Sequence, residues 1–230
     1  MNKKLFVATA TLLVGSAFGT ATALAAENPM DQAGIQHNMY LGCLMEAKAS
    51  PEEAVAVLVE KCGYDPGMPL ERFIATRQPM IDAIDPTRPM TENLTELRQQ
   101  LSAYEFSFIV RMDQIVQNAG GLDAAAVQLE ELEREGIARL DPRSKNGALV
   151  LGGLSVARHS ARYWSKFATD TTSNKATSPD PNTGWAMVTA SDVGGYYALG
   201  VSGNSVLSSA FSYAAYKMLA SEGYFPLYAN

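Results

Sequence analysis

Two histidines and one isolated aspartate are the side chains of this 230-residue chain that could most readily do chemistry. His37 is followed by Asn38, while His159 lies far along the chain, close to two arginines. Asp192 is the only charged residue between positions 184 and 216. A histidine and an aspartate could join one of the many serines in a Ser-His-Asp site for hydrolysis, in which the imidazole accepts the serine's proton. We therefore treat His37 and Asp192 as candidate catalytic residues.

Each of these residues also has a structural interpretation. A His-Asn pair at a helix start is typical of a hydrogen-bonded polar network, which is the role we expect for His37 and Asn38. His159 would lie at a surface or between helices. Asp192 would cap a glycine-rich helix or form an ion pair with Arg158 or Arg162.

The sequence lacks the motifs that usually accompany catalysis. It contains no Gly-x-Ser-x-Gly elbow, no Gly-x-x-x-x-Gly-Lys phosphate loop and no His-Glu-x-x-His zinc motif. Two cysteines and two distant histidines do not have the spacing of a metal site. We therefore favour a protein that is not an enzyme, and we predict no cofactor and no metal.

The two cysteines, Cys43 and Cys62, could form a disulfide, a metal pair or a redox pair. A redox pair usually has the spacing Cys-x-x-Cys, and a metal needs more ligands than this chain offers nearby. In an oxidising compartment two such cysteines are usually bonded to each other. The prediction is a structural disulfide.

The first 25 residues have the features of a signal peptide. Lys3 and Lys4 precede a short apolar run, and the alanines at positions 23 and 25 of Ala23-Leu24-Ala25 suit a signal peptidase. We expect cleavage before Ala26 and export to the periplasm or the exterior. The net charge of −6 disfavours nucleic acids and anionic lipid surfaces as partners.

Helical patterns cover most of the remaining chain, whereas strand alternation is missing. Capping residues, apolar 3-4 spacing and breaks at Pro and Gly predict helices over 33–48, 51–62, 69–84, 91–118, 123–140 and 142–168. The prediction is an all-α, irregular helical bundle of about seven to eight helices. It would comprise a signal peptide (1–25), a bundle (26–168), a polar linker (169–183) and a helical hairpin packing on the bundle (184–230).

The C-terminal segment has an unusual composition. Small residues recur every four positions, as in the series Gly200, Asn204, Ser208 and Ser212, which lets helices approach closely. The segment could insert into a membrane, or it could turn near residues 200–204 and close the core of the bundle. Its modest hydrophobicity favours the second alternative. We expect four aromatic residues to contact partners: Trp164, Trp185, Tyr196 and Tyr197.

Two stretches resemble a group of uncharacterised bacterial proteins. Residues 34–41 are similar to that group's Gly-x-x-His-Asn-x-x-Leu opening. Residues 160–164, Trp185 and residues 190–195 resemble its ending, where Tyr-Trp precedes a tryptophan and an Ala-x-Asp-x-x-Gly run. The tails of that group often resemble the glycine-zipper segments of bacteriocins. The resemblance implies an organisation of the chain and no activity.

These observations support two functional hypotheses. The first is an exported helical protein that acts by binding or contact with an unknown protein or cell-envelope component, including a bacteriocin-like role. The alternative is a small secreted hydrolase with its site near His37 and Asp192. Convergence of these two side chains and a nucleophile in one pocket would favour the hydrolase.

Overall fold

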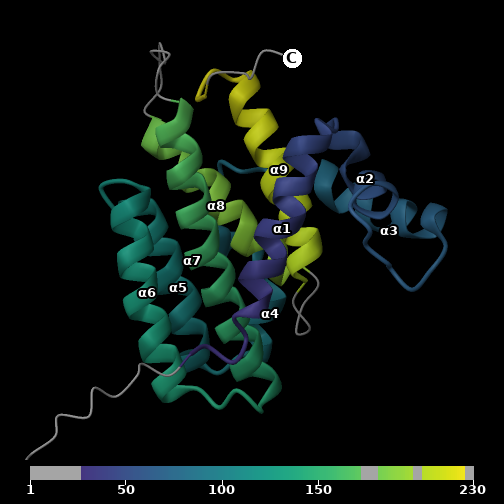
Figure 1. Cartoon of the computed structure of the whole chain (residues 1–230). Coiled ribbons are helices and arrows are strands. Elements are labelled where there is room, and N and C mark those ends of the chain that lie inside the picture. Colours follow the sequence, from purple (N-terminus) through teal and green to yellow (C-terminus); the bar gives the residue numbers. More distant parts are fainter. Residues whose placement is uncertain (1–26, 172–180, 199–203, 226–230) are drawn as a thin grey trace, which may run out of the picture.

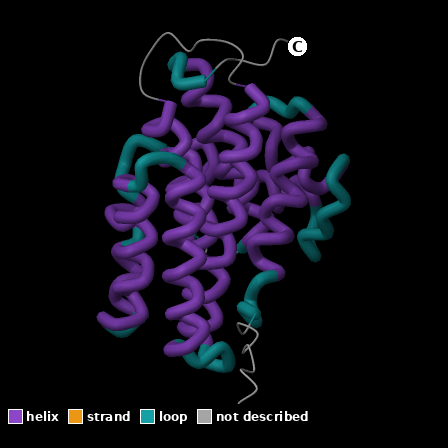
Figure 2. The backbone as a smooth tube through the Cα atoms, turned by 60° about the vertical axis from the view of Figure 1, so that its left-hand side comes forward, coloured by secondary structure: helices purple, strands orange, loops and turns teal. Residues whose placement is uncertain are grey.

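The structure, a computed structural model, describes residues 27–171, 181–198 and 204–225, and all regular structure in these ranges is helical (Figures 1 and 2). This confirms the predicted all-α bundle. The described residues form nine α-helices and two 3-10 turns: α1 (Gln32–Ala47), η1 (Pro51–Glu53), α2 (Ala54–Glu60), α3 (Leu70–Asp82), η2 (Met90–Asn93), α4 (Thr95–Gln100), α5 (Ala103–Asn118), α6 (Leu122–Arg139), α7 (Lys145–Thr171), α8 (Pro181–Tyr197) and α9 (Ser205–Ser221).

Three predicted features fall wholly or partly outside the described residues. The signal peptide does so entirely. The middle of the predicted linker does so too, while its two ends belong to α7 and α8. Of the predicted turn near residues 200–204, only Asn204 is described, and its side chain accepts a hydrogen bond from the Leu207 backbone N–H at the start of α9. Within the described helices, none is long and apolar enough to cross a membrane.

The centre of the molecule is formed by α1, α7, α8 and α9 (Figure 1). Helices α8 and α9 form a hairpin, closed by a 3.0 Å hydrogen bond from the Asn204 backbone N–H to the Tyr196 carbonyl. Helix α1 lies against both α7 and α9, so the first and last described α-helices are neighbours. The C-terminal hairpin therefore supplies part of the core and is not an attachment to its outside.

The long helix predicted over 91–118 is divided into three elements, which corrects that prediction. Helix α4 ends before Leu101, whose backbone is extended, and α5 begins after Ser102. The Ser102 hydroxyl accepts from the Glu105 backbone N–H at 3.2 Å, and the Glu105 carboxylate accepts from the Ser102 N–H at 2.8 Å. This capping box starts a new helix because it satisfies backbone groups that a continuous helix would bond internally.

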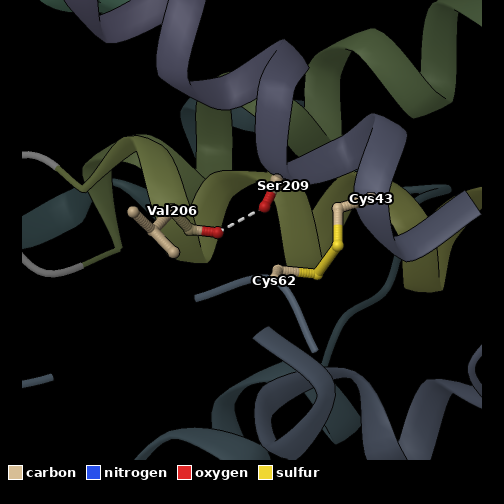
Figure 3. Close-up of a disulfide and its surroundings, with 4 residues drawn as sticks. All are labelled: Cys43, Cys62, Val206 and Ser209. Atoms are coloured by element: carbon tan, nitrogen blue, oxygen red, sulfur yellow. Dashed lines mark hydrogen bonds between the residues drawn. A yellow bond between two sulfur atoms is a disulfide. The ribbon is translucent and has the colours of Figure 1, made fainter. Parts of the chain in front are cut away.

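A disulfide between Cys43 and Cys62 fastens α1 to the residues that follow α2 (Figure 3). The Cα atoms are 5.8 Å apart, as the predicted disulfide requires. Gly63 then reverses the chain with a φ of +73°, a conformation that glycine adopts without steric cost. Helix α3, which comes next, extends away from the bundle in Figure 1 and contacts mainly α2 and η1.

Candidate functional site

His37, Asp192 and Ser208 meet at the centre of the bundle, and all three are fully buried. They come from α1, α8 and α9 respectively. The Ser208 hydroxyl lies 3.0 Å from Nδ1 of His37, and Nε2 of His37 lies 3.5 Å from Oδ2 of Asp192. The two predicted catalytic residues are therefore brought together with a serine, as the hydrolase hypothesis requires.

The direction of the hydrogen bonds does not suit a nucleophile, however. Ser208 has one hydroxyl proton, and its shortest contact is 2.5 Å, to the backbone carbonyl of Asp192. With the proton donated there, Ser208 has none left to donate to Nδ1 of His37. In a hydrolase the serine must instead donate its proton to the imidazole. None of the cavities described below is lined by these three residues.

The Asp192 carboxylate is held by α7 and not by the arginines proposed from the sequence. Oδ2 accepts hydrogen bonds from the Ser160 hydroxyl and from Nε1 of Trp164, the latter at 3.2 Å. Arg162 pairs with Glu130 instead. A buried carboxylate that is bonded in this way joins four helices, since α1, α7, α8 and α9 all contribute to the network.

Gly34 and Asn38, which flank His37 in the Gly-x-x-His-Asn motif, both face α7. A Cβ at position 34 would lie 2.6 Å from the Ser155 carbonyl oxygen, so only glycine allows this close approach. The Asn38 side chain donates to the His159 carbonyl at 3.0 Å, while His37 turns toward α9. All three motif residues therefore contact other helices, which supports the structural interpretation of the His-Asn pair.

His159 lies between helices, within a partly buried charged cluster. The Arg158 guanidinium contacts both Asp31 and Glu133, and Nε2 of His159 lies 3.0 Å from Oδ1 of Asp31. Burial and the charge of Arg158 lower the pKa of His159 below its usual 6.5. Burial opposes the ionisation of Asp31, but the hydrogen bond from His159 and the charge of Arg158 outweigh it and lower the pKa of Asp31. The cluster fastens the start of α1 to α6 and α7.

The four aromatic residues predicted to contact a partner are buried in the core, each at most 7% exposed. Trp164 stacks on Trp185 and on Tyr216, with ring centroids 5.3 and 5.2 Å apart. Tyr196 and Tyr197 are buried against α7. In the structure these rings therefore contribute to packing within the bundle.

A cleft of about 490 Å³ opens between the end of α3 and the bundle, and we call it the α3–α8 cleft. Its outer wall comes from α3 and the chain leading into α4, and its floor is the small-residue face of α8. It is lined by Met80, Ala83, Ile84, Asp85, Arg88, Met90, Leu94, Ala190, Ser191, Gly194, Gly195, Ala198 and Phe211.

Two further cavities flank the same segment. One of about 320 Å³ shares Arg88 and Ala190 with the α3–α8 cleft. The other, of about 630 Å³, lies between η1, α3 and α9 and shares Ile84 with the cleft. Sequence reasoning missed this region because Asp85-Pro86 and Arg88-Pro89 were interpreted only as helix breaks. Asp85 and Arg88 are charged residues at a junction between predicted helices, and this was the feature of the sequence that could have indicated a site here.

No group of three or more histidine, cysteine, aspartate or glutamate side chains in the described part of the chain could hold a metal ion. Comparison with known proteins adds nothing to the geometry, because no family model, curated protein or solved structure matches the chain. The function must therefore be argued from the cleft and the buried network.

Proposed function

We propose that the protein is exported and acts by binding a small, mostly apolar molecule in the α3–α8 cleft. The observation that carries this proposal is the cleft itself. Its volume lies within the range of about 300–1,000 Å³ that is common for ligand sites, and apolar side chains form most of its wall. The cell-envelope component expected from the sequence would enter here.

The small residues of α8 support this assignment, because they leave the floor of the cleft open. A Cβ at Gly194 would meet only Met90, at 3.9 Å, which is ordinary van der Waals contact. A larger side chain at position 194 would therefore project into the cleft without first displacing the backbone. This position offers a way to fill the site selectively.

The test is a thermal-shift screen of small apolar molecules on the wild type and on two variants. Gly194→Leu fills the cleft, while Gly42→Leu makes the same change on α1, where a Cβ would meet nothing within 4 Å. Because a ligand that binds only the folded state raises the melting temperature, ligands should stabilise the wild type and Gly42→Leu but not Gly194→Leu. Equal stabilisation of all three proteins would contradict binding in the cleft.

The convergence of Ser208, His37 and Asp192 supports a hydrolase as the second candidate. A fluorophosphonate reacts with serines that are activated as nucleophiles, so it distinguishes the two candidates. The geometry predicts no labelling of Ser208 in the native protein, because its hydroxyl is buried and donates to a carbonyl. Labelling that is lost in both Ser208→Ala and His37→Gln would favour the hydrolase.

Export has a test of its own. We expect the protein recovered from the periplasm or the culture medium to begin at Ala26, which Edman sequencing or intact-mass measurement would show. A mature protein that retains Lys3 and Lys4 outside the cytoplasm would contradict cleavage at this site.

A further inference from the structure

Asp85 and Arg88 are the two charged residues that line the α3–α8 cleft, and Arg88 is the cation of the pair. It lines both this cleft and the neighbouring 320 Å³ cavity, and its side chain is 63% exposed. Its Nε donates to Oδ2 of Asp85 at 3.1 Å. Oδ1 of Asp85 accepts from the backbone and the hydroxyl of Thr87, so the carboxylate is fixed and holds the guanidinium in place.

Arg88 still has donors for a second anion. Asp85 engages only Nε, and within the described part of the chain neither Nη atom has a hydrogen-bond partner. The same protein contains a guanidinium that binds two carboxylates at once, since Arg158 contacts Glu133 through Nε and Asp31 through Nη2. A neighbouring carboxylate is therefore compatible with binding another one, because Nη2 carries a second N–H that points away from Nε.

We propose that the ligand of the α3–α8 cleft is a fatty acid, with its carboxylate on Arg88 and its alkyl chain along the apolar wall. This inference rests on the proposed function and names the class of ligand. Two of the lining residues are methionines, Met80 and Met90, whose flexible thioethers adapt to alkyl chains of different shape. The guanidinium supplies the charge that complements the carboxylate.

The lining also argues against a peptide. Ser191 is the one hydroxyl among the lining residues, and it already donates to the Met187 carbonyl at 2.9 Å. Most of the floor belongs to the interior of α8, where backbone groups bond within the helix. A peptide would bury amide groups that find few partners here, and unpaired amides weaken binding. An alkyl chain carries no such groups.

The experiment measures, by isothermal titration calorimetry, the binding of three compounds with the same ten-carbon chain: decanoate, 1-decanol and decyltrimethylammonium. We expect decanoate to bind the wild type most tightly. Arg88→Gln should weaken decanoate binding about tenfold and leave the affinity for decanol nearly unchanged. Arg143→Gln is the matched control, because Arg143 also pairs with a nearby aspartate, Asp141, on the surface but lines none of these cavities.

Gly194→Leu should abolish binding of decanoate, and Gly42→Leu should not. If Gly194→Leu does not fold, Ala83→Phe narrows the same cleft from an exposed position at the end of α3. Two results would overturn the fatty-acid assignment but leave the proposed function standing. The first is equal affinity of the wild type for all three compounds, and the second is decanoate binding that Arg88→Gln does not change. In both cases the binding must be lost in Gly194→Leu. Failure of all three to bind the wild type would also overturn the assignment. Decanoate binding that survives both cleft-filling variants would contradict the cleft itself.

Discussion

The phenolic oxygen of Tyr197 ends against the backbone of Gly153, so close that a Cβ at position 153 would lie 1.9 Å from it. Tyr196 and Gly152, one residue earlier in each helix, have the same relationship at the same distance. Two consecutive glycines of α7 therefore accommodate two consecutive tyrosines of α8. Because these positions have no side chains, the two helices can approach closely. This contact explains why α7 contains two glycines, although glycine within a helix weakens it.

Gly153→Ala should consequently destabilise the protein. Overpacking of this kind costs about 1–3 kcal/mol, partly offset by the better helix propensity of alanine. Gly42→Ala is the control, because it gains the same propensity where a new Cβ meets nothing within 4 Å. Urea unfolding should give a lower free energy of unfolding for Gly153→Ala and a slightly higher one for Gly42→Ala. A rise for both would mean that Tyr197 does not lie on Gly153.

Alkaline pH should unfold the protein through the same tyrosines. Burial raises the pKa of Tyr196 to about 12, and burial and then the neighbouring Tyr196 raise that of Tyr197 well above its usual 10. Because the folded-state values are raised, the stability they contribute is complete below about pH 10 and is lost as the pH rises toward the folded-state values. Ultraviolet titration should show these two phenols ionising later than the exposed tyrosines. Tyr196→Phe should remove one late-titrating group, and an unchanged titration would exclude this assignment.

Acid should weaken the attachment of α1. The pKa values of His159 and Asp31 are both lowered in the folded protein, so the unfolded chain binds more protons than the folded one. The contribution of His159 is present above its unfolded value of about 6.5 and decreases as the pH falls below it; that of Asp31 is lost at still lower pH. Melting temperature should therefore fall between pH 7 and pH 5 in the wild type. His159→Gln should flatten this part of the profile, and the same slope in both proteins would exclude His159 as its cause.

Two adjacent serines of α9 provide a matched test of the buried network. The Ser208 hydroxyl joins α9 to His37 and to the Asp192 carbonyl, while the Ser209 hydroxyl donates to the carbonyl of Val206 in its own helix, its one partner among the described residues (Figure 3). Both side chains are fully buried. Ser208→Ala should cost about 1–3 kcal/mol in urea unfolding because it leaves His37 without that partner. Ser209→Ala should cost clearly less, and similar losses for both would argue against a network that joins helices.

Removing the disulfide tests how the α2–α3 segment is held. Cys43→Ser combined with Cys62→Ser should lower the free energy of unfolding by about 3 kcal/mol, according to the chain-entropy relation for a loop of this size. The folded oxidised protein should show no reaction with a thiol reagent. Labelling of both cysteines in the native exported protein would contradict the bond.

The sequence allowed the fold class and most helices to be predicted, because capping residues, prolines and 3-4 apolar spacing act locally. The break at Ser102 could also have been predicted, since Ser102-x-x-Glu105 is a capping box within an otherwise continuous apolar pattern. The disulfide was predicted from the number of cysteines, and the structure confirms it.

The sites were less predictable, because they depend on which helix faces which. His37 and Asp192 were chosen from residue type and, for Asp192, from its isolation in an uncharged stretch, and nothing in the sequence indicated that Ser208 would lie between them. Arg158 was a plausible partner for Asp192, yet it faces Asp31 and Glu133 on another side of α7. The α3–α8 cleft combines parts of α3, α8 and α9, whose side-by-side arrangement is a tertiary property.

The contact between α1 and α9 has a consequence for the order of events during synthesis. His37 meets Ser208, which lies 171 positions later in the chain. The side of α1 that packs on α9 consequently has no partner until the ribosome has made nearly the whole protein, whereas the side that packs on α7 meets its partner earlier. The core therefore reaches its final form only when synthesis is nearly complete, because it contains side chains of α9, one of the last segments to be made.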